Sequence, residues 1–152
     1  MSMKAIKTVL DHAEKQCIKS GTRLTEKRRQ LLGQLLASGK AMSAYELADN
    51  FAKKFEEKIS PMSVYRILDI LRKANLVHKL NLSKKYIACA HITCEHSHAI
   101  PQFLICRQCD KVSEISIQKK TIGEIGEQVK LANFQLLNPQ LELHCICNDC
   151  QT

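Results

Sequence analysis

No stretch of this 152-residue sequence approaches the roughly 18 consecutive apolar residues that a membrane span needs. The first residues carry no apolar segment of the kind found in secretory signals. Glycine and proline are few, with 5 and 3 copies, and no segment is repetitive or of low complexity. These absences predict a cytoplasmic protein of one or two small domains, with no membrane partner and with disorder confined to the ends.

The charge is unevenly distributed along the chain. Residues 1–85 hold 18 Lys and Arg against 8 Asp and Glu, a net charge of +10, whereas residues 86–152 hold 5 against 7, a net charge of −2. Only one of the eight cysteines lies in the basic part. A local basic excess favours binding to DNA phosphates, although a merely soluble basic surface is the alternative. The contrast indicates two domains with different roles.

Two Cys-x-x-Cys pairs, Cys106/Cys109 and Cys147/Cys150, dominate the second part. This spacing lets one tight turn present two sulfurs to one metal, and two such turns supply the four thiolates of a closed structural zinc site. The 37 residues between the pairs are enough for a small subdomain. Buried free cysteines and redox dithiols are the alternatives, and disulfides are not expected because cytosolic thiols stay reduced.

The basic part predicts four helices followed by a hairpin. Apolar residues at helical spacing predict helices over residues 3–20 and 61–74, and between them two helices that begin after the N-cap residues Thr25 and Ser43. The last helix starts at Ser60-Pro61, or at Ser63 if Pro61 and Met62 belong to the loop. Glu46 occupies the capping-box position after Ser43. Two β-like runs follow, at residues 76–81 and 85–89.

Helices followed by a hairpin are typical of a winged helix-turn-helix domain, with residues 61–74 as the recognition helix. Arg66 can bind guanine O6 and N7 bidentately from the opening turns, and Tyr65 can reach a phosphate or a thymine methyl group. Ser63 lies on or beside the same free face. The alternative is that Tyr65 packs against the core and Arg66 is a solvated charge.

The second part predicts a small α/β domain. Residues 90–101 show neither helical nor strand periodicity and are expected to form a hinge. The expected elements beyond it are strands at 102–106 and 112–117, a helix at 118–131, and a strand pair at 134–137 and 141–146. A unit of this size cannot bury both faces of its sheet, which predicts a homodimer. The overall class is therefore α+β, with domains at 1–89, 90–101 and 102–152.

A second set of potential metal ligands lies in or beside the hinge. His78 and Cys89 end the two strands of the hairpin, which should bring them close together, and Glu114 lies in the second domain. His91, Cys94, His96 and His98 add further ligands. A mixed set of imidazole, thiolate and carboxylate suits zinc, whereas a set without thiol suits iron or manganese. We therefore expect about two zinc ions per chain, one of them regulatory, although a lone histidine such as His78 is more often structural.

Three stretches of the chain resemble the ferric uptake regulator superfamily. Residues 21–28 (GTRLTEKR) resemble its first winged-helix segment, residues 63–68 (SVYRIL) its recognition helix, and residues 103–109 (FLICRQC) its zinc knuckle. The resemblance extends over nearly the whole chain. Three further stretches are most similar to the zinc-sensing branch of the superfamily: SAYEL at 43–47, LVHKL at 76–80 and YIAC at 86–89.

The resemblance implies a dimeric transcriptional repressor that binds palindromic operator DNA when zinc is plentiful and represses zinc-uptake genes. It places Cys106, Cys109, Cys147 and Cys150 on the structural zinc ligands, and His78, Cys89, Glu114 and a hinge histidine on the regulatory ones. Distance from the knuckle favours His98 as that histidine, with His96 second. Tyr45 and Arg66 fall on positions that read bases, and Arg23, Ser63 and Tyr65 complete the expected DNA-binding set.

Rival functions are less well supported by the sequence. An iron, manganese or peroxide sensor on the same scaffold is the nearest, but Cys89 disfavours it, as does Pro101-Gln102 where ferric sensors favour a histidine-rich run. A thiol oxidoreductase or zinc hydrolase is disfavoured because no thioredoxin-like βαβ pattern and no HExxH motif are present. We therefore expect neither an enzyme nor a small-molecule substrate, and a zinc-storage role leaves the basic half unexplained.

Overall fold

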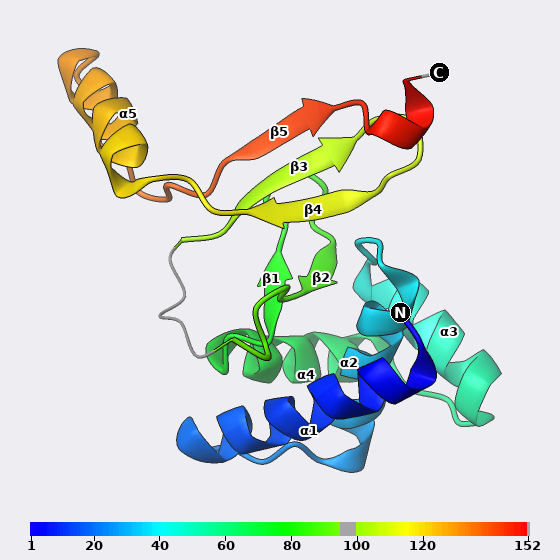
Figure 1. The fold of residues 1–152 in the computed structure, drawn as a ribbon. Helices are drawn as coiled ribbons and strands as arrows, with labels where there is room; N and C mark the ends of the chain where they lie inside the picture. The colour runs from blue at the N-terminus through cyan, green and yellow to red at the C-terminus, as the bar shows by residue number, and fades with distance from the viewer. Residues whose placement is uncertain (95–99, 152) are drawn as a thin grey trace. The chain divides into compact units, whose positions relative to one another are not determined.

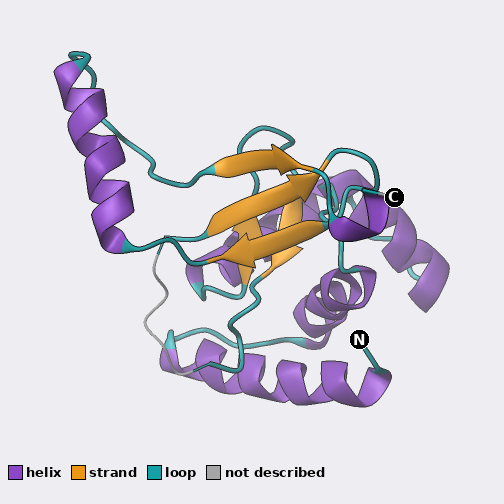
Figure 2. Cartoon of the chain, turned by 45° about the horizontal axis from the view of Figure 1, so that its top comes forward, coloured by secondary structure: helices purple, strands orange, loops and turns teal. Residues whose placement is uncertain are grey.

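The structure, a computed structural model, describes residues 1–94 and 100–151 and forms two compact units, Met1–His96 and Ser97–Thr152. The predicted α+β class is confirmed, because helices dominate the first unit and a three-stranded sheet dominates the second (Figure 1; Figure 2). The boundary falls within residues 90–101, and the role of this segment as a metal-binding hinge stays a prediction. His96 and His98 lie outside the described residues.

Four helices and a short hairpin build the first unit. Their bounds are α1 (Met3–Lys19), α2 (Glu26–Ser38), α3 (Ala44–Phe55), α4 (Pro61–Lys73), β1 (Val77–Lys79) and β2 (Tyr86–Ala88). Three of the helices are capped by serine side chains, which accept a backbone N–H bond from the first turn: Ser2 for α1, Ser43 for α3 and Ser60 for α4. Ser43 and Glu46 form the predicted capping box, which satisfies two otherwise unpaired N–H groups at the start of α3.

The core of the first unit lies between the inward faces of the helices. Val64, Leu68 and Leu71 of α4 are fully buried and belong to one cluster with Leu47 and Phe51 of α3. Each fully buried side chain of this size contributes about 1.5–3 kcal/mol relative to the exposed state. Because this packing holds α3 and α4 together, it determines which faces of these two helices remain open to a partner.

The hairpin of the first unit is hydrogen-bonded along both edges of β2. β1 and β2 are antiparallel, with Val77 opposite Ala88 and His78 opposite Ile87. On the other edge Met42 and Tyr86 exchange two backbone hydrogen bonds of 2.9 and 2.8 Å. The segment that leads into α3 is therefore joined directly to the wing.

The second unit is a mixed sheet with the strand order β4-β3-β5. Its elements are β3 (Gln102–Cys106), β4 (Val112–Ile115), α5 (Lys119–Leu131), β5 (Glu142–Cys145) and the 3-10 turn η1 (Asn148–Cys150). β3 pairs antiparallel with β4 and parallel with β5. The buried Gln102 side chain holds the entry to β5, since its Nε2 donates to the Pro139 carbonyl at 2.9 Å and its Oε1 accepts from the Leu141 N–H.

The predicted strand at 134–137 is wrong. These residues are irregular, and β5 pairs with β3 instead of forming a hairpin with them. Phe134 and Leu137 are 73% and 85% exposed. The apolar pattern of this segment therefore does not reflect a strand. Its exposed apolar side chains are not covered by the described part of the chain, so they are free to contact another molecule.

α5 packs little against its own unit. No residue of α5 is buried, and the helix extends beyond the end of the sheet rather than covering a face of it (Figure 1; Figure 2). Ile125, Val129 and Ala132 line an open apolar groove together with Phe134. The apolar face of α5 and the segment that follows it are thus not packed against the rest of the second unit.

Candidate metal centre and nucleic-acid interface

The two Cys-x-x-Cys pairs meet at one end of the three-stranded sheet. Cys106 ends β3 and Cys109 lies in the β3–β4 turn, while Cys147 and Cys150 follow β5. β3 and β5 are parallel, with Cys106 opposite Cys145, so both segments leave the sheet at the same end. The four sulfurs of the two pairs lie within 4.8 Å of one another.

This geometry fits a tetrahedral zinc ion. Zinc–sulfur bonds of about 2.3 Å place the sulfurs of a tetrahedral site about 3.8 Å apart. The Sγ atoms of Cys109 and Cys147 are 3.7 Å apart, and none of the four cysteines forms a disulfide. Four thiolates complete the coordination shell, so such a site braces the fold and leaves no position for a catalytic water.

Hydrogen bonds shift the pKa values of two of the four thiols in opposite directions. The pKa of Cys106 is lowered to about 6, chiefly by the N–H of Cys147 and also by those of Cys109 and Gln108. The pKa of Cys150 is raised to about 12, because its thiol is hydrogen-bonded to Cys147 and Cys109. These backbone donors therefore favour the thiolate form of Cys106. Metal binding must displace the proton of Cys150, so metal affinity falls as the pH falls.

An ion pair joins the two knuckles outside the sulfur cluster. Lys111 Nζ lies 3.3 Å from Asp149 Oδ2, although both side chains are exposed. The pKa of Lys111 is raised, first by its hydrogen bond to Asp149 and then by the charges of Asp149, Cys147 and Cys109. A cation beside four thiolates and one divalent ion partly offsets the net negative charge of the site.

The hairpin of the first unit brings together two of the predicted regulatory ligands. His78 lies in β1, Cys89 follows β2, and a ring nitrogen of His78 lies within 4.8 Å of the Cys89 sulfur. Backbone bonds hold Cys89 in place, since its N–H donates to Leu76 at 2.9 Å and its sulfur accepts the N–H of His91 at 3.4 Å. Cys89 is 3% exposed. An imidazole and a buried thiol at this separation are a suitable half of a tetrahedral metal site.

The other predicted regulatory ligands belong to the second unit or fall outside the described residues. Glu114 is in β4 of the second unit, opposite Phe103. His98 and its alternative His96 fall outside the described residues. The full set of four regulatory ligands therefore stays a prediction.

Tyr45 and Arg66, two of the predicted DNA-binding residues, are exposed on the helices α3 and α4. Tyr45 is the second residue of α3 and is 63% exposed. Arg66 is exposed on α4. Within residues 1–94 and 100–151, neither side chain makes a hydrogen bond or an ion pair. Both are thus open to an external partner.

Ser63 and Tyr65 are more involved in packing and capping than the sequence suggested. The Ser63 N–H donates to Ser60 Oγ at 3.2 Å, and the two hydroxyls are 2.9 Å apart. Tyr65 is half-buried, with its ring 6.4 Å from that of Tyr86 in an edge-on arrangement. Their contribution to DNA binding stays a prediction, and the packing alternative holds at least for the body of Tyr65.

Arg23 projects from a loop that another arginine organises. Arg28 donates one hydrogen bond of 2.5 Å to the Arg23 carbonyl and another of 3.4 Å to the Thr22 hydroxyl. The Arg23 side chain is exposed, with no ion pair to the described part of the chain. A cation on a tethered loop is suited to a phosphate contact.

Comparison with known proteins identifies the family. The Ferric uptake regulator family matches residues 19–144. The chain belongs to this family. It is 31% identical to the zinc uptake regulation protein of Escherichia coli over 93% of this chain and 81% of that protein. It is 27% identical to the peroxide operon regulator of Bacillus subtilis over 86% of each chain. A solved structure titled as a zinc uptake regulator complexed with zinc and DNA superposes with a TM-score of 0.82 at 26% identity, covering 99% and 96% of the two chains.

Members of the ferric uptake regulator family are metal-responsive transcription regulators, and the chain is a regulator of this kind rather than an enzyme. Its first unit is the N-terminal winged helix-turn-helix domain of the fold, and its second unit is the small α/β domain. Among the described residues, no helix combines the length and apolar character needed to cross a membrane.

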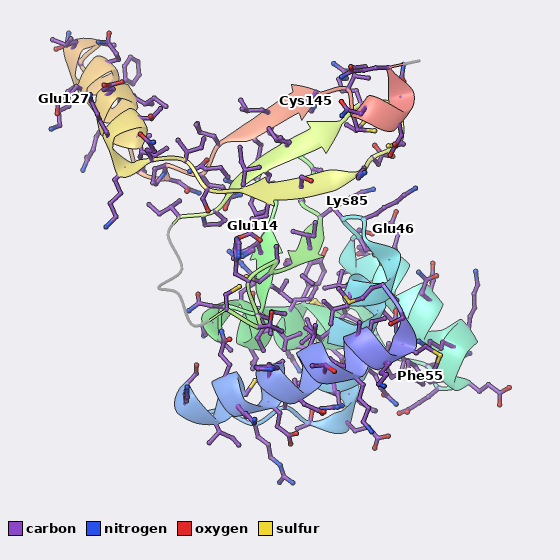
Figure 3. All side chains as sticks on the ribbon, viewed as in Figure 1. Glu46, Phe55, Lys85, Glu114, Glu127 and Cys145 are labelled. Carbon is purple, nitrogen blue, oxygen red and sulfur yellow. The ribbon has the colours of Figure 1, made fainter. Side chains whose placement is uncertain are left out.

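The sequence did not predict an ion pair between the hairpin and the start of α3. Lys85, next to β2, lies 3.6 Å from Glu46, the capping-box residue of α3 (Figure 3). Glu46 also accepts the Ser43 N–H at 2.8 Å, and this bond, ahead of the Lys85 charge, holds its pKa below the usual range. The capping box signals a helix start but not which strand lies beside it, so the sequence alone could not reveal this connection.

Proposed function

We propose that this regulator is a zinc-responsive repressor. It binds palindromic operator DNA as a homodimer when its regulatory site holds zinc, and it thereby represses zinc-uptake genes. The supporting observation is the proximity of the His78 ring nitrogen and the Cys89 sulfur, within 4.8 Å. A thiolate favours zinc over iron and manganese, which are better served by oxygen and nitrogen ligands. The similarity to a zinc uptake regulator solved with zinc and DNA supports the same assignment.

We propose two zinc ions per chain. The structural ion is held by Cys106, Cys109, Cys147 and Cys150. The regulatory ion is held by His78, Cys89, Glu114 and a hinge histidine, His98 in preference to His96. A ligand that binds one arrangement of a protein more tightly shifts its population toward that arrangement, and zinc and DNA then strengthen each other's binding.

The DNA-binding surface is built on the basic first unit. We propose that Tyr45 and Arg66 contact bases, and that Arg23, Ser63 and Tyr65 contact the backbone or flanking groups. In a two-fold symmetric dimer the recognition helices α4 meet successive major grooves, which places the half-sites about 34 Å apart. The net charge of +10 on residues 1–85 makes binding steeply dependent on salt.

The decisive experiment measures zinc and DNA binding together. A DNA duplex is first selected from random sequences with the zinc-loaded protein. The zinc content per chain and the affinity for this duplex are then measured before and after mild chelation. Finally, the apo protein is reloaded with Zn²⁺, Fe²⁺ or Mn²⁺. Two zinc ions, of which one is readily removed with loss of DNA binding and restored only by Zn²⁺, support the proposal. Restoration by Fe²⁺ or Mn²⁺ alone would assign the chain to a sibling sensor, and similarity to the peroxide operon regulator keeps that alternative open.

Replacement of Cys89 by serine is expected to abolish zinc-dependent DNA binding while one zinc per chain remains. The serine hydroxyl is not a thiolate, so the regulatory site loses its softest ligand, whereas the four-cysteine site is untouched. Zinc content and DNA affinity with and without added zinc test this expectation.

The matched control for this variant is Cys17→Ser. Cys17 is also a buried thiol of the first unit, and burial raises its pKa, which disfavours a ligand role. Both variants lose comparable packing, but only Cys89→Ser should lose the response to zinc. Equal losses in the two variants would mean that Cys89 acts through the core rather than as a ligand.

We propose that the homodimer forms through the second unit. Phe134 and Leu137 are exposed, as is Leu131 at the end of α5, and the groove beside α5 is apolar. Replacement of Phe134 by aspartate is expected to weaken dimerisation at least tenfold, since a charge would then be desolvated at the interface. Sedimentation over a concentration series measures the effect. Ile18→Asp is the control, because Ile18 is exposed on α1 of the first unit and its replacement should leave the dimer intact.

A further inference from the structure

Met62 stands out among the exposed side chains of the recognition helix. Ser60 caps α4, Pro61 is its first residue and Met62 its second. The Met62 side chain is 62% exposed. Single exposed apolar residues are common on protein surfaces, so exposure alone carries no meaning. The position of Met62 relative to its neighbours on the helix is the informative observation.

Met62 lies on the outward face of α4, on the same side as Arg66. Residues four apart on a helix are neighbours on its surface, and Val64, Leu68 and Leu71 occupy the opposite, buried side. Further along this face Asp69 is paired with Arg72 at 3.8 Å. Arg66 has no ion pair with the described residues. The N-terminal half of the outward face thus presents an unneutralised cation with an apolar side chain one turn before it.

We propose that Met62 is a specificity-determining residue, which contacts the C5 methyl group of a thymine next to the base read by Arg66. The inference rests on the proposed function, in which α4 enters the major groove. The first residues of a recognition helix contact base edges, and the thymine methyl is the one apolar group that the major groove presents. The methionine side chain is unbranched and adaptable, so it can follow a methyl group without a strict geometry.

Two kinds of base readout, hydrogen bonding and methyl contact, would then lie on one face of α4. Arg66 reads hydrogen-bond acceptors, whereas Met62 reads the presence of a methyl group. Loss of one buried methyl contact corresponds to a change in affinity of about three- to fivefold. The homodimer makes the contact twice, so removal from both half-sites should lower affinity about tenfold or more.

Thymine-to-deoxyuridine replacement tests the contact, because deoxyuridine lacks only the methyl group. An operator is first selected from random duplexes with the zinc-loaded wild-type protein. Each thymine of the half-site is then replaced in turn, and affinities are measured for wild type and Met62→Ala. We expect one thymine whose replacement lowers the DNA affinity of the wild type about three- to fivefold per half-site. The same replacement should leave the affinity of Met62→Ala unchanged. Met62→Leu should retain the sensitivity.

Met3→Ala is the matched control, since Met3 is exposed on α1, at 89%, and its loss should leave the wild-type profile unchanged. Equal sensitivity of wild type and Met62→Ala at every thymine overturns the role of Met62 but leaves the repressor function intact. Failure of the wild type to select any sequence overturns the proposed function itself. Thermal unfolding verifies that the exposed substitution leaves the fold intact.

Discussion

Replacement of Arg66 by alanine is expected to abolish operator-specific binding while the zinc content stays unchanged. A bidentate arginine–guanine contact contributes about 1–3 kcal/mol of discrimination, and the homodimer makes two such contacts. The combined loss of about 2–6 kcal/mol corresponds to roughly 30-fold to more than 10⁴-fold in specific affinity. Binding to unrelated DNA should fall far less, because the rest of the basic surface remains.

The appropriate control for Arg66 is Arg72→Ala. Arg72 lies on the same helix and the substitution removes the same charge, but Arg72 is in the last turn and is paired with Asp69. Competition between operator and unrelated duplex at fixed salt separates the two variants. Retained discrimination by Arg66→Ala, or equal loss in both variants, would show that Arg66 contributes only its charge.

Replacement of Cys106 by serine is expected to release the structural zinc and unfold the second unit. Structural zinc contributes about 10–16 kcal/mol of apparent binding free energy in small zinc domains at neutral pH, and a typical domain is stable by only about 5–15 kcal/mol. Cys106 is also the thiol whose pKa is lowered most clearly, by the N–H groups around it. We expect the variant to hold one zinc fewer per chain and to lose the dimer.

Cys145 provides the comparison for this experiment. It lies on β5 (Figure 3), directly opposite Cys106 in the parallel pair β3–β5, but it is not among the four clustered sulfurs. Cys145→Ser should keep the zinc and the dimer. Zinc analysis and sedimentation of the two variants distinguish them, and zinc retention by Cys106→Ser would contradict the four-cysteine site.

Local signals in the sequence predicted the helices well. Ser43 and Glu46 form the expected capping box, and α4 begins at Pro61 with Ser60 as its cap, because these features depend on residues three or four apart. Thr25 also precedes α2 as expected, although its side chain makes no capping bond. The spacing of Cys106 and Cys109 likewise predicted a knuckle from purely local geometry.

Features that depend on a distant partner were not predictable in this way. The run at 134–137 has the apolar character of a strand but finds no strand beside it, and β5 pairs with β3 across the intervening α5. The two backbone bonds between Met42 and Tyr86 join residues 44 positions apart. The periodicity of a segment shows which of its faces is apolar. Which element packs against that face depends on the whole fold.

The absence of any buried residue on α5 has a thermodynamic consequence. A helix of 13 residues is marginal on its own in water, so in the homodimer proposed above its order would depend on the surface supplied by the second copy of the chain. Folding of this unit is then coupled to association, and its melting temperature should rise with protein concentration. In a cell, the concentration of the protein would then influence the fraction of folded regulator, independently of metal binding.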